Sequence, residues 1–265
     1  MKAAQETRRR KLAEADALLA GFDEYLLDRL GLAAVTGQDQ AAFATRLDQV
    51  RSSKRINPQY FHPERMSAIQ AMQNASTNLK PYVLSTIADF KREVVPADAS
   101  DNYIGLANVQ SNTGELVKTT DRPSGTCFRF SEDDVLFARL RPYLNKVHRA
   151  ERSGVCSMEF HVIRLHKEEG SENEVLPGYL SSILRSSMIL AQVKYMTTGN
   201  THPRLANEDV VNLVIPVPEV PVQREIVAEM HRRRKESRKL KGEARVGWEE
   251  AKAEFERKLL GRESG

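Results

Sequence analysis

The spacing of hydrophobic residues changes three times along the chain. In residues 3–30 the apolar side chains recur every three or four positions, which places them on one face of a helix. Gly31 follows directly, and glycine is a common residue at the end of a helix. This first region therefore predicts an amphipathic helix with a narrow apolar seam. The seam residues are Leu12, Ala15, Leu19, Phe22, Leu26 and Leu30.

Shorter elements are predicted between this helix and the middle of the chain. The polar and apolar pattern favours helices at residues 39–52 and 64–75. Residues 54–66 contain two prolines, and we expect irregular structure there up to the start of the helix at residue 64. Residues 74–81 have the composition of a connector between elements.

The middle of the chain contains short runs rich in β-branched and aromatic residues. Asp, Asn, Gly and Pro separate the runs, which is typical of the strands of a mixed sheet. The runs occupy residues 82–95, 102–110, 114–118, 127–130, 134–140 and 159–165. A helix is expected over residues 177–196, and the apolar run 213–218 is expected to close the sheet. Pro218 and Pro221 favour extended backbone at the residues before them.

Residues 221–260 return to a helical period. Forty helical residues would span about 60 Å, far more than the usual helix of about 11 or 12 residues. A helix of this length needs a partner, and the N-terminal helix is the candidate, in this chain or in a second copy. We expect antiparallel pairing through Leu12, Leu19, Phe22 and Leu26 on one helix and Leu240, Trp248, Phe255 and Leu259 on the other.

These patterns together predict an α+β protein. We expect a mixed-sheet domain flanked by helices, with a long C-terminal helix that forms a coiled-coil-like spacer. The expected boundaries are a helical region at residues 1–78, the mixed-sheet domain at 79–219 and the long helix at 220–265.

Composition narrows the class of protein only slightly. Of the 265 residues, 40% are hydrophobic and 29% charged, and no apolar run approaches the roughly 20 residues of a membrane helix. The N-terminus has acidic residues inside its apolar part, so we expect no secretory signal. Cys127 and Cys156 are expected to be buried free thiols of a cytoplasmic protein. The formal net charge of +4 weakly favours a polyanionic partner.

Motifs of catalysis are missing from the sequence. It contains no Gly-x-x-x-x-Gly-Lys-Ser/Thr loop, no Gly-x-Gly-x-x-Gly fingerprint and no Gly-x-Ser-x-Gly elbow. The segment Asn57-Pro58-Gln59-Tyr60 differs by one residue from the Asn-Pro-Pro-Tyr signature of DNA adenine methyltransferases, but no glycine-rich turn precedes it to hold S-adenosylmethionine. The histidines show no metal-ligand spacing. They are His62, His148, His161, His166, His202 and His231. We therefore expect no catalytic residue, no cofactor and no metal.

Two stretches are rich in groups that bind phosphate or base edges. Residues 134–149 deliver several basic side chains around Pro142, and arginine offers paired donors that suit phosphate and guanine. Residues 197–204 offer hydroxyl and amide groups around a glycine that permits close backbone approach. Composition alone favours the alternative that both are solvated loops beside a sheet. The candidate DNA-binding residues are Arg139, Arg141, Asn145, Lys146, Thr197, Thr198, Gly199, Asn200, Thr201 and Arg204.

The order of these segments resembles one protein family. A strand with Arg-Pro and a nearby Lys is followed by a Thr-Gly loop, an apolar strand, a Pro-x-Pro exit and Gln223 with Ile226 at the start of the long helix. This succession, over about residues 80–260, resembles the target-recognition domain of type I restriction-modification DNA specificity (S) subunits. Residues 55–65 are similar to the short lead-in of such a domain, and residues 26–32 to the end of the family's spacer helix.

The resemblance implies a non-catalytic, cytoplasmic subunit that recognises a bipartite site in double-stranded DNA. Its partners would be methyltransferase subunits that bind S-adenosylmethionine, and in addition a restriction subunit; no membrane is implied. Family members usually carry two recognition domains and this chain has one. That implies a half-length subunit that forms a homodimer or pairs with a second half-subunit, or half of a longer subunit.

Two other functions stay open. The chain could be the DNA-reading module of a methyltransferase-fused or split enzyme. It could also be a helical adaptor without nucleic acid, in which residues 231–239 are only a solvated helix face.

Overall fold

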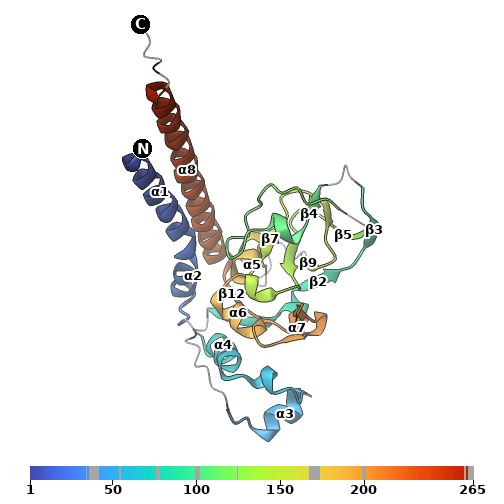
Figure 1. Ribbon diagram of the computed structural model, residues 1–265. Helices are drawn as coiled ribbons and strands as arrows, with labels where there is room; N and C mark the ends of the chain where they lie inside the picture. The colour runs from blue at the N-terminus through green and yellow to red at the C-terminus, as the bar shows by residue number, and fades with distance from the viewer. Residues whose placement is uncertain are drawn as a thin grey trace. The chain divides into compact units, whose positions relative to one another are not determined.

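We describe a computed structural model of the chain (Figure 1), for residues 1–33, 35, 42–53, 55–75, 78–98, 102–123, 125–166, 174–198, 201–259 and 261. By its packing the chain divides into two units. The helical unit consists of residues 1–22 and 228–265, and the globular unit of residues 23–227. The boundaries that the sequence predicts at residues 78 and 219 remain predictions.

The helical unit contains α1 (Lys2–Ala20) and most of α8 (Val220–Leu259). Residue numbers rise along one helix as the numbers of their partners fall along the other, so the two helices run antiparallel. The contacts that show this are Lys11 Nζ with Glu243 Oε2 at 2.8 Å, Lys241 Nζ with Asp16 Oδ1 at 3.0 Å, and the Arg8 guanidinium 5.3 Å from the centre of a Trp248 ring.

The buried residues of the helical unit are of mixed size. They are Ala15, Phe22, Met230, Ser237, Leu240 and Ala244, while Leu12, Leu19 and Trp248 are half-buried. Two other residues of the predicted seam are exposed: Phe255 is 46% and Leu259 69% accessible to solvent.

The N-terminal helix is shorter than the sequence predicts. One helix over residues 3–30 is expected, but α1 ends at Ala20 and α2 (Phe22–Leu30) follows. Gly21 separates the two helices, and its N–H still donates to Ala17 O at 3.0 Å. The predicted stop at Gly31 is confirmed, because this residue ends α2 with a φ of 65°.

The globular unit contains two four-stranded sheets. The order of the first is β2-β9-β6-β7, with antiparallel neighbours throughout. The order of the second is β3-β5-β8-β4, in which only β4 and β8 are parallel, so it is a mixed sheet. The predicted α+β class is confirmed. The strands are β2 (Ala88–Lys91), β3 (Val94–Pro96), β4 (Tyr103–Ile104), β5 (Thr126–Phe130), β6 (Val135–Ala138), β7 (Val147–Arg149), β8 (Gly154–Cys156) and β9 (Phe160–Leu165).

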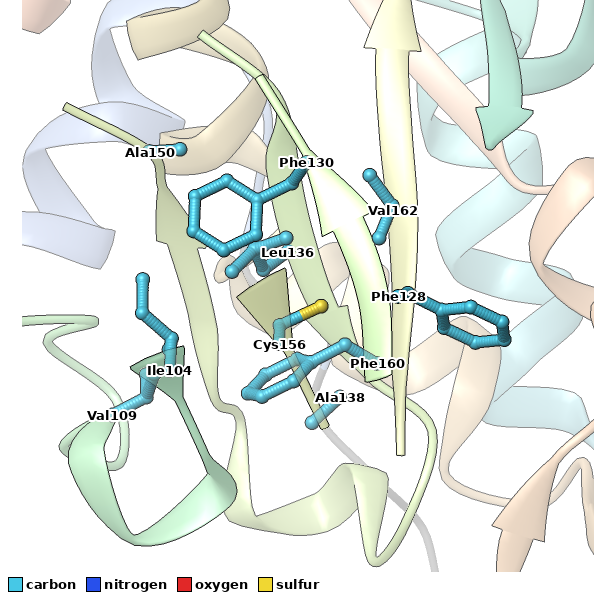
Figure 2. Packing of buried hydrophobic residues seen from close by; sticks show 10 residues of the cluster. All are labelled: Ile104, Val109, Phe128, Phe130, Leu136, Ala138, Ala150, Cys156, Phe160 and Val162. Atoms are coloured by element: carbon cyan, nitrogen blue, oxygen red, sulfur yellow. The ribbon is translucent and has the colours of Figure 1, made fainter. Parts of the chain in front are cut away.

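One apolar cluster joins the two sheets (Figure 2). Phe128 and Phe130 come from the mixed sheet, and Leu136, Phe160 and Val162 from the antiparallel one. Full burial of such a side chain contributes about 1.5–3 kcal/mol. The two sheets therefore stabilise each other, and the loops at their edges start from a rigid base. As predicted, Cys127 and Cys156 are buried free thiols.

Two further two-stranded sheets lie in the globular unit: β1 (Leu79–Val83) with β12 (Val214–Pro218), and β10 (Thr197–Thr198) with β11 (Arg204–Leu205). Its helices are α3 (Leu47–Ser53), α4 (Pro63–Gln73), α5 (Pro177–Ile183), α6 (Ser187–Val193) and α7 (Asn207–Val211). Its 3₁₀ turns are η1 (Pro58–Phe61), η2 (Leu84–Thr86), η3 (Leu106–Asn108) and η4 (Pro142–Leu144).

Several sequence-based elements need correction. The helix expected at residues 39–52 is limited to α3, none of whose residues is buried, so nothing stabilises a longer helix there; residues 39–41 lie outside the described residues. The expected connector at 74–81 contains the start of β1. The single helix expected at 177–196 is two helices, because the Ser186 hydroxyl accepts from Ile189 N and begins α6 afresh.

The apolar run at 213–218 also has a different partner from the expected one. It forms β12, which pairs with β1 and closes neither four-stranded sheet. Pro81 and Pro216 are cross-strand partners in this pair. Proline lacks an N–H and suits an edge strand, which explains why the pair stays two-stranded.

Gln223 fixes the first turn of α8 within the globular unit. Its side chain is fully buried, accepts from Leu176 N at 2.8 Å, and donates to Glu174 O at 2.8 Å and Pro218 O at 2.9 Å. Both N–H groups of this amide, and one of the two lone pairs of its oxygen, are thus hydrogen-bonded to backbone groups.

Candidate nucleic-acid interface

The two polar stretches found separately in the sequence meet at the end of β6. Arg141 N donates to Pro203 O at 2.8 Å, and Leu205 N donates to Arg139 O at 2.9 Å. Leu140 and Arg204 form an antiparallel bridge between these bonds. Residues 139–141 and 203–205 therefore form one surface of the globular unit.

A rigid turn follows β6 on this surface. The 3₁₀ turn η4 lies between Arg141 (φ 49°, ψ 60°) and Asn145 (φ 51°, ψ 51°), both left-handed. Such backbone is uncommon outside glycine and persists only where the surroundings hold it. Here Leu144 N donates to Arg141 O and Asn145 N to Pro142 O, each at 2.9 Å.

Asn145 and Lys146 stabilise this turn from inside the fold. Asn145 is buried, and its Nδ2 donates to Arg185 O at 2.8 Å. Lys146 is half-buried, its Nζ donates to Leu106 O at 2.7 Å, and burial lowers the pKa of its amine. Both were candidates for direct DNA contact. Each side chain thus supports the turn with one hydrogen bond to a main-chain oxygen, and a direct contact of either residue with DNA stays a prediction.

Arg139 is half-buried and lines a small cavity with Phe90, His161 and Asn207. Its Nε is buried and has no hydrogen-bond partner among the described residues. Burial first, and the Arg139 charge second, lower the pKa of His161 to about 4, so this imidazole is neutral at pH 7. Part of the Arg139 side chain therefore packs within the fold.

Arg204 is oriented by a carboxylate. Its Nε lies 3.0 Å from Glu159 Oε2, and its Nη2 lies 2.6 Å from Glu159 Oε1. The hydrogen bonds from Arg204 hold the pKa of Glu159 below its usual value, against the opposite effect of burial. The Arg204 side chain remains 42% exposed, so its guanidinium is held at the surface in one orientation.

The exposed side chains of the surface include two that the sequence did not single out. Tyr143 is 51% and Leu144 37% accessible, at the tip of η4, and Arg141 is exposed just before them in the chain. Thr201 and His202 are exposed in the other segment, directly before Pro203. Pro142 after a strand signals a turn, and that signal identifies the next residue as its tip.

The rest of the second stretch is only partly described. Thr197 is half-buried and pairs with Leu205. The side chain of Thr198, and Gly199 and Asn200 as a whole, lie outside the described residues.

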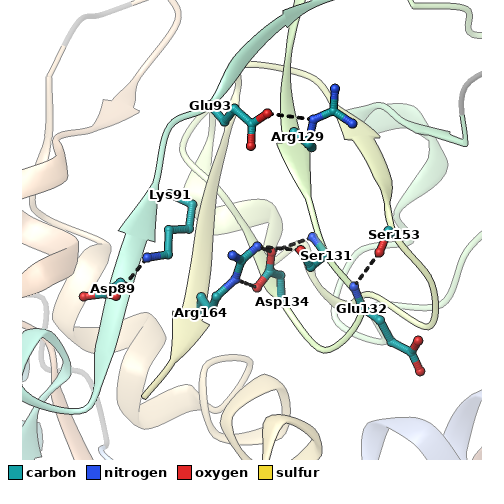
Figure 3. A network of polar contacts seen from close by, with 9 residues as sticks. All are labelled: Asp89, Lys91, Glu93, Arg129, Ser131, Glu132, Asp134, Ser153 and Arg164. Atoms are coloured by element: carbon teal, nitrogen blue, oxygen red, sulfur yellow. Dashed lines mark hydrogen bonds and ion pairs between the residues drawn. The ribbon is translucent and has the colours of Figure 1, made fainter. Parts of the chain in front are cut away.

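The two ends of β6 differ in charge. At its start Asp134 is buried and receives two hydrogen bonds from Arg164, from Nε and Nη2, both at 2.7 Å (Figure 3). Glu132 and Asp133 are exposed beside it, and Asp133 forms an ion pair with Arg149 at 2.7 Å. The globular unit contains 23 Lys and Arg against 25 Asp and Glu, so its overall charge does not attract DNA. Any attraction depends on a local basic surface, and the end of β6 that carries Arg139 and Arg141 is the suitable one.

Other candidate chemistry has structural explanations. Asn57 Oδ1 accepts from Gln59 N at 3.0 Å and begins η1, while the Arg65 guanidinium lies 4.0 Å from the centre of the Tyr60 ring. Across the described residues no cluster of three His, Cys, Asp or Glu could hold a metal ion. Within the same part of the chain no helix is both long and apolar enough to cross a membrane.

Comparison with known proteins gives a likeness of fold. No protein-family model matches the chain, and no curated protein matches it. A solved chain described under "Structural basis underlying complex assembly and conformational transition of the type I R-M system" is 13% identical, with a TM-score of 0.52 over 96% of this chain and 53% of that chain. The chain shares this fold. The resemblance predicted from the sequence is thus confirmed at the level of the fold.

Two further solved chains are similar. One is the HsdS subunit from Thermoanaerobacter tengcongensis, with 24% identity, a TM-score of 0.49 and coverage of 70% of this chain and 48% of that one. The other is the type I restriction-modification system S subunit from M. genitalium, with 12% identity, a TM-score of 0.45 and coverage of 93% and 58%. This chain therefore spans about half the length of the solved chains that it matches.

Proposed function

We propose that the chain is a sequence-specific DNA-recognition subunit of a type I restriction-modification system. The observation that carries this proposal is the surface at the end of β6. There a rigid turn with Arg141, Tyr143 and Leu144 is hydrogen-bonded to the segment that contains Arg204. The likeness of fold to a type I chain supports the same function.

The surface suits a DNA groove in chemical terms. Arg141 can pair two donors with guanine O6 and N7, and Thr201 can bind either groove edge or phosphate. Tyr143 and Leu144 offer apolar contact to a base or a thymine methyl group. Because Glu159 orients Arg204, this guanidinium loses little freedom on binding, and it serves as a fixed phosphate contact that sets the register.

The proposed subunit acts with partners. It directs methyltransferase subunits, which carry S-adenosylmethionine, and a restriction subunit to a bipartite site. Each chain supplies one recognition surface. A second copy, or a second half-subunit, supplies the other surface that a bipartite site needs. The chain itself performs no chemistry, so the purified protein with S-adenosylmethionine is expected neither to methylate nor to cut DNA.

Selection from a randomised duplex library tests the recognition function. We expect the purified chain to enrich one short sequence, and Arg141→Ala to abolish the enrichment while leaving thermal unfolding unchanged. A matched control is Arg122→Ala, which changes an exposed arginine elsewhere in the globular unit. Equal enrichment of all sequences by the wild-type chain would reject sequence recognition.

A further inference from the structure

The positive charge of the chain lies in its helical unit. Residues 1–22 and 228–265 contain 17 Lys and Arg against 11 Asp and Glu, whereas the globular unit contains 23 against 25. The excess is further concentrated within α8. Residues 231–245 contain eight Lys and Arg and two Glu, while residues 246–259 contain three Lys and Arg and four Glu.

Half of these eight basic residues lie on one side of α8. Lys235, Arg238, Lys239 and Arg245 are exposed and recur at helical spacing, so they share a face. At 3.6 residues per turn this basic face lies opposite the buried seam of Ser237, Leu240 and Ala244, and thus points away from α1. Its four members are referred to below as the basic face.

Ion pairs within the helical unit do not remove the excess. Lys239 Nζ lies 3.3 Å from Glu236 Oε1, in a pair whose side chains are 62% and 42% exposed. Glu243 and Asp16 form their ion pairs with Lys11 and Lys241, which lie outside the basic face. Exposed pairs of this kind contribute about 0–1 kcal/mol, so a phosphate can replace the carboxylate at little cost.

The residue types on the basic face favour a polyanion over a protein partner. The centres of protein interfaces are enriched in aromatic residues and depleted in lysine. None of its four members is apolar or acidic, and the exposed Val246 is a single apolar residue on the same side of the helix, seven positions after Lys239. Residues 231–245 span about 21 Å, a length over which duplex DNA presents roughly one negative charge per 1.7 Å of its axis.

We propose that the basic face of α8 binds the sugar-phosphate backbone of duplex DNA without recognising bases. This proposal rests on the proposed function for the identity of the polyanion. It adds a second contact surface, in the helical unit, whose contribution is the same for every DNA sequence and is sensitive to salt.

The test compares two triple variants by fluorescence anisotropy on a random-sequence duplex, over a range of salt concentrations. In Lys235→Gln/Arg238→Gln/Lys239→Gln the slope of log K against log salt is expected to fall by about 2.7, because each phosphate that the variant no longer neutralises removes about 0.9. The control Lys252→Gln/Arg257→Gln/Lys258→Gln removes the same charge from the same helix and is expected to keep the wild-type slope. Glutamine favours helix as lysine does, and circular dichroism checks that both variants fold.

The outcomes separate this proposal from the recognition function. If the wild-type chain binds DNA and both triple variants keep its slope, or reduce it equally, the basic face is not a DNA contact and the surface at the end of β6 is unaffected. If the first variant alone reduces the slope while no sequence is ever enriched, the basic face binds DNA and sequence recognition is wrong. A wild-type chain that binds no duplex overturns both.

Discussion

Arg233 donates a hydrogen bond from Nη1 to the main-chain oxygen of Leu18, 3.1 Å away, across the two helices of the helical unit. Leu18 belongs to the last turn of α1, where carbonyl groups lack helical partners and carry partial negative charge. Glu229 holds the same guanidinium in place through Nε at 2.6 Å. The contact thus ends α1 just before Gly21 and fixes α8 in register with it.

Arg233→Met should therefore destabilise the protein. Methionine keeps the apolar stem but loses the charged cap, and a hydrogen bond that involves a charged group contributes about 1.5–3 kcal/mol. Urea unfolding measures this loss. Arg245→Met, at an exposed position of the same helix, is the control and should change the free energy of unfolding by less than about 0.5 kcal/mol. Equal effects of the two substitutions would contradict the capping role.

Stability should also fall in acid through Glu229. Hydrogen bonds from Arg232 first, and also from Arg233, lower the pKa of this carboxyl to about 2 from its usual 4.5. A carboxyl whose pKa is depressed in the folded state stabilises the fold above its unfolded pKa, and this contribution is lost as the pH falls from about 4.5 to 2. Urea unfolding at pH 6 and pH 3 measures the loss. Glu229→Gln should show a smaller difference between the two pH values, and an unchanged difference would reject this assignment.

The ring of Tyr143 should contribute to DNA binding. Tyr143→Ala removes an exposed aromatic side chain from a turn whose backbone is held by other residues, so folding should be unaffected. Tyr143 is 51% exposed, so about half of the 1.5–3 kcal/mol of full burial remains to be gained against DNA, and affinity for the selected sequence should fall by about 1 kcal/mol. Tyr143→Phe is the conservative control and should retain most of the affinity in anisotropy titrations. A loss in both variants would point to the hydroxyl instead, and no loss in either would place the tyrosine outside the interface.

Self-association should depend on the exposed end of α8. Phe255 and Leu259 continue the apolar row of this helix but are exposed, so a second copy is the proposed cover. We expect a dimer in light scattering at tens of micromolar, and a monomer after Phe255→Glu. Val246→Glu, which changes an exposed apolar residue away from that row, should leave the mass unchanged. A strict monomer of the wild-type chain would reject the homodimer.

The proposed dimer also limits the DNA site. A two-fold assembly presents two identical surfaces to inverted half-sites. About 60 Å of helix corresponds to roughly 17 base pairs at 3.4 Å each, which sets an upper bound on the separation of the half-sites. A selected site with half-sites further apart than this would require a different assembly.

Sequence patterns located the ends of the long helical regions better than the breaks inside them. Many residues contribute to each pattern, whereas a break depends on a single residue such as Gly21 or Ser186. The period that ends at Gly31 and the one that begins near Pro221 correspond to real helix boundaries. Short elements were harder. The strand β8 has three residues, too few to show any alternation, although it lies in the interior of the mixed sheet.

The candidate interface could be predicted in its composition but not in its geometry. Arg141 and Arg204 were identified as candidates, but their joining depends on hydrogen bonds between backbones more than 60 positions apart, which leave no mark on either segment. Asn145 shows the opposite case. A polar side chain near two arginines in the sequence suggests a surface role. Only the fold shows that the Asn145 amide donates a hydrogen bond to Arg185 O inside the protein.

The opposite charges at the ends of β6 have a consequence for how DNA approaches. This strand, about 13 Å long, lies between the exposed carboxylate of Glu132 before its start and the exposed guanidinium of Arg141 beyond its end, while Asp133 is paired with Arg149. In the field of a polyanion such a pair of charges experiences a torque, which turns the arginine end forward and the carboxylate end away. If the chain binds DNA as proposed, this pair of charges favours one orientation from a distance of about 10 Å, the screening length in 0.1 M salt, before any base is touched.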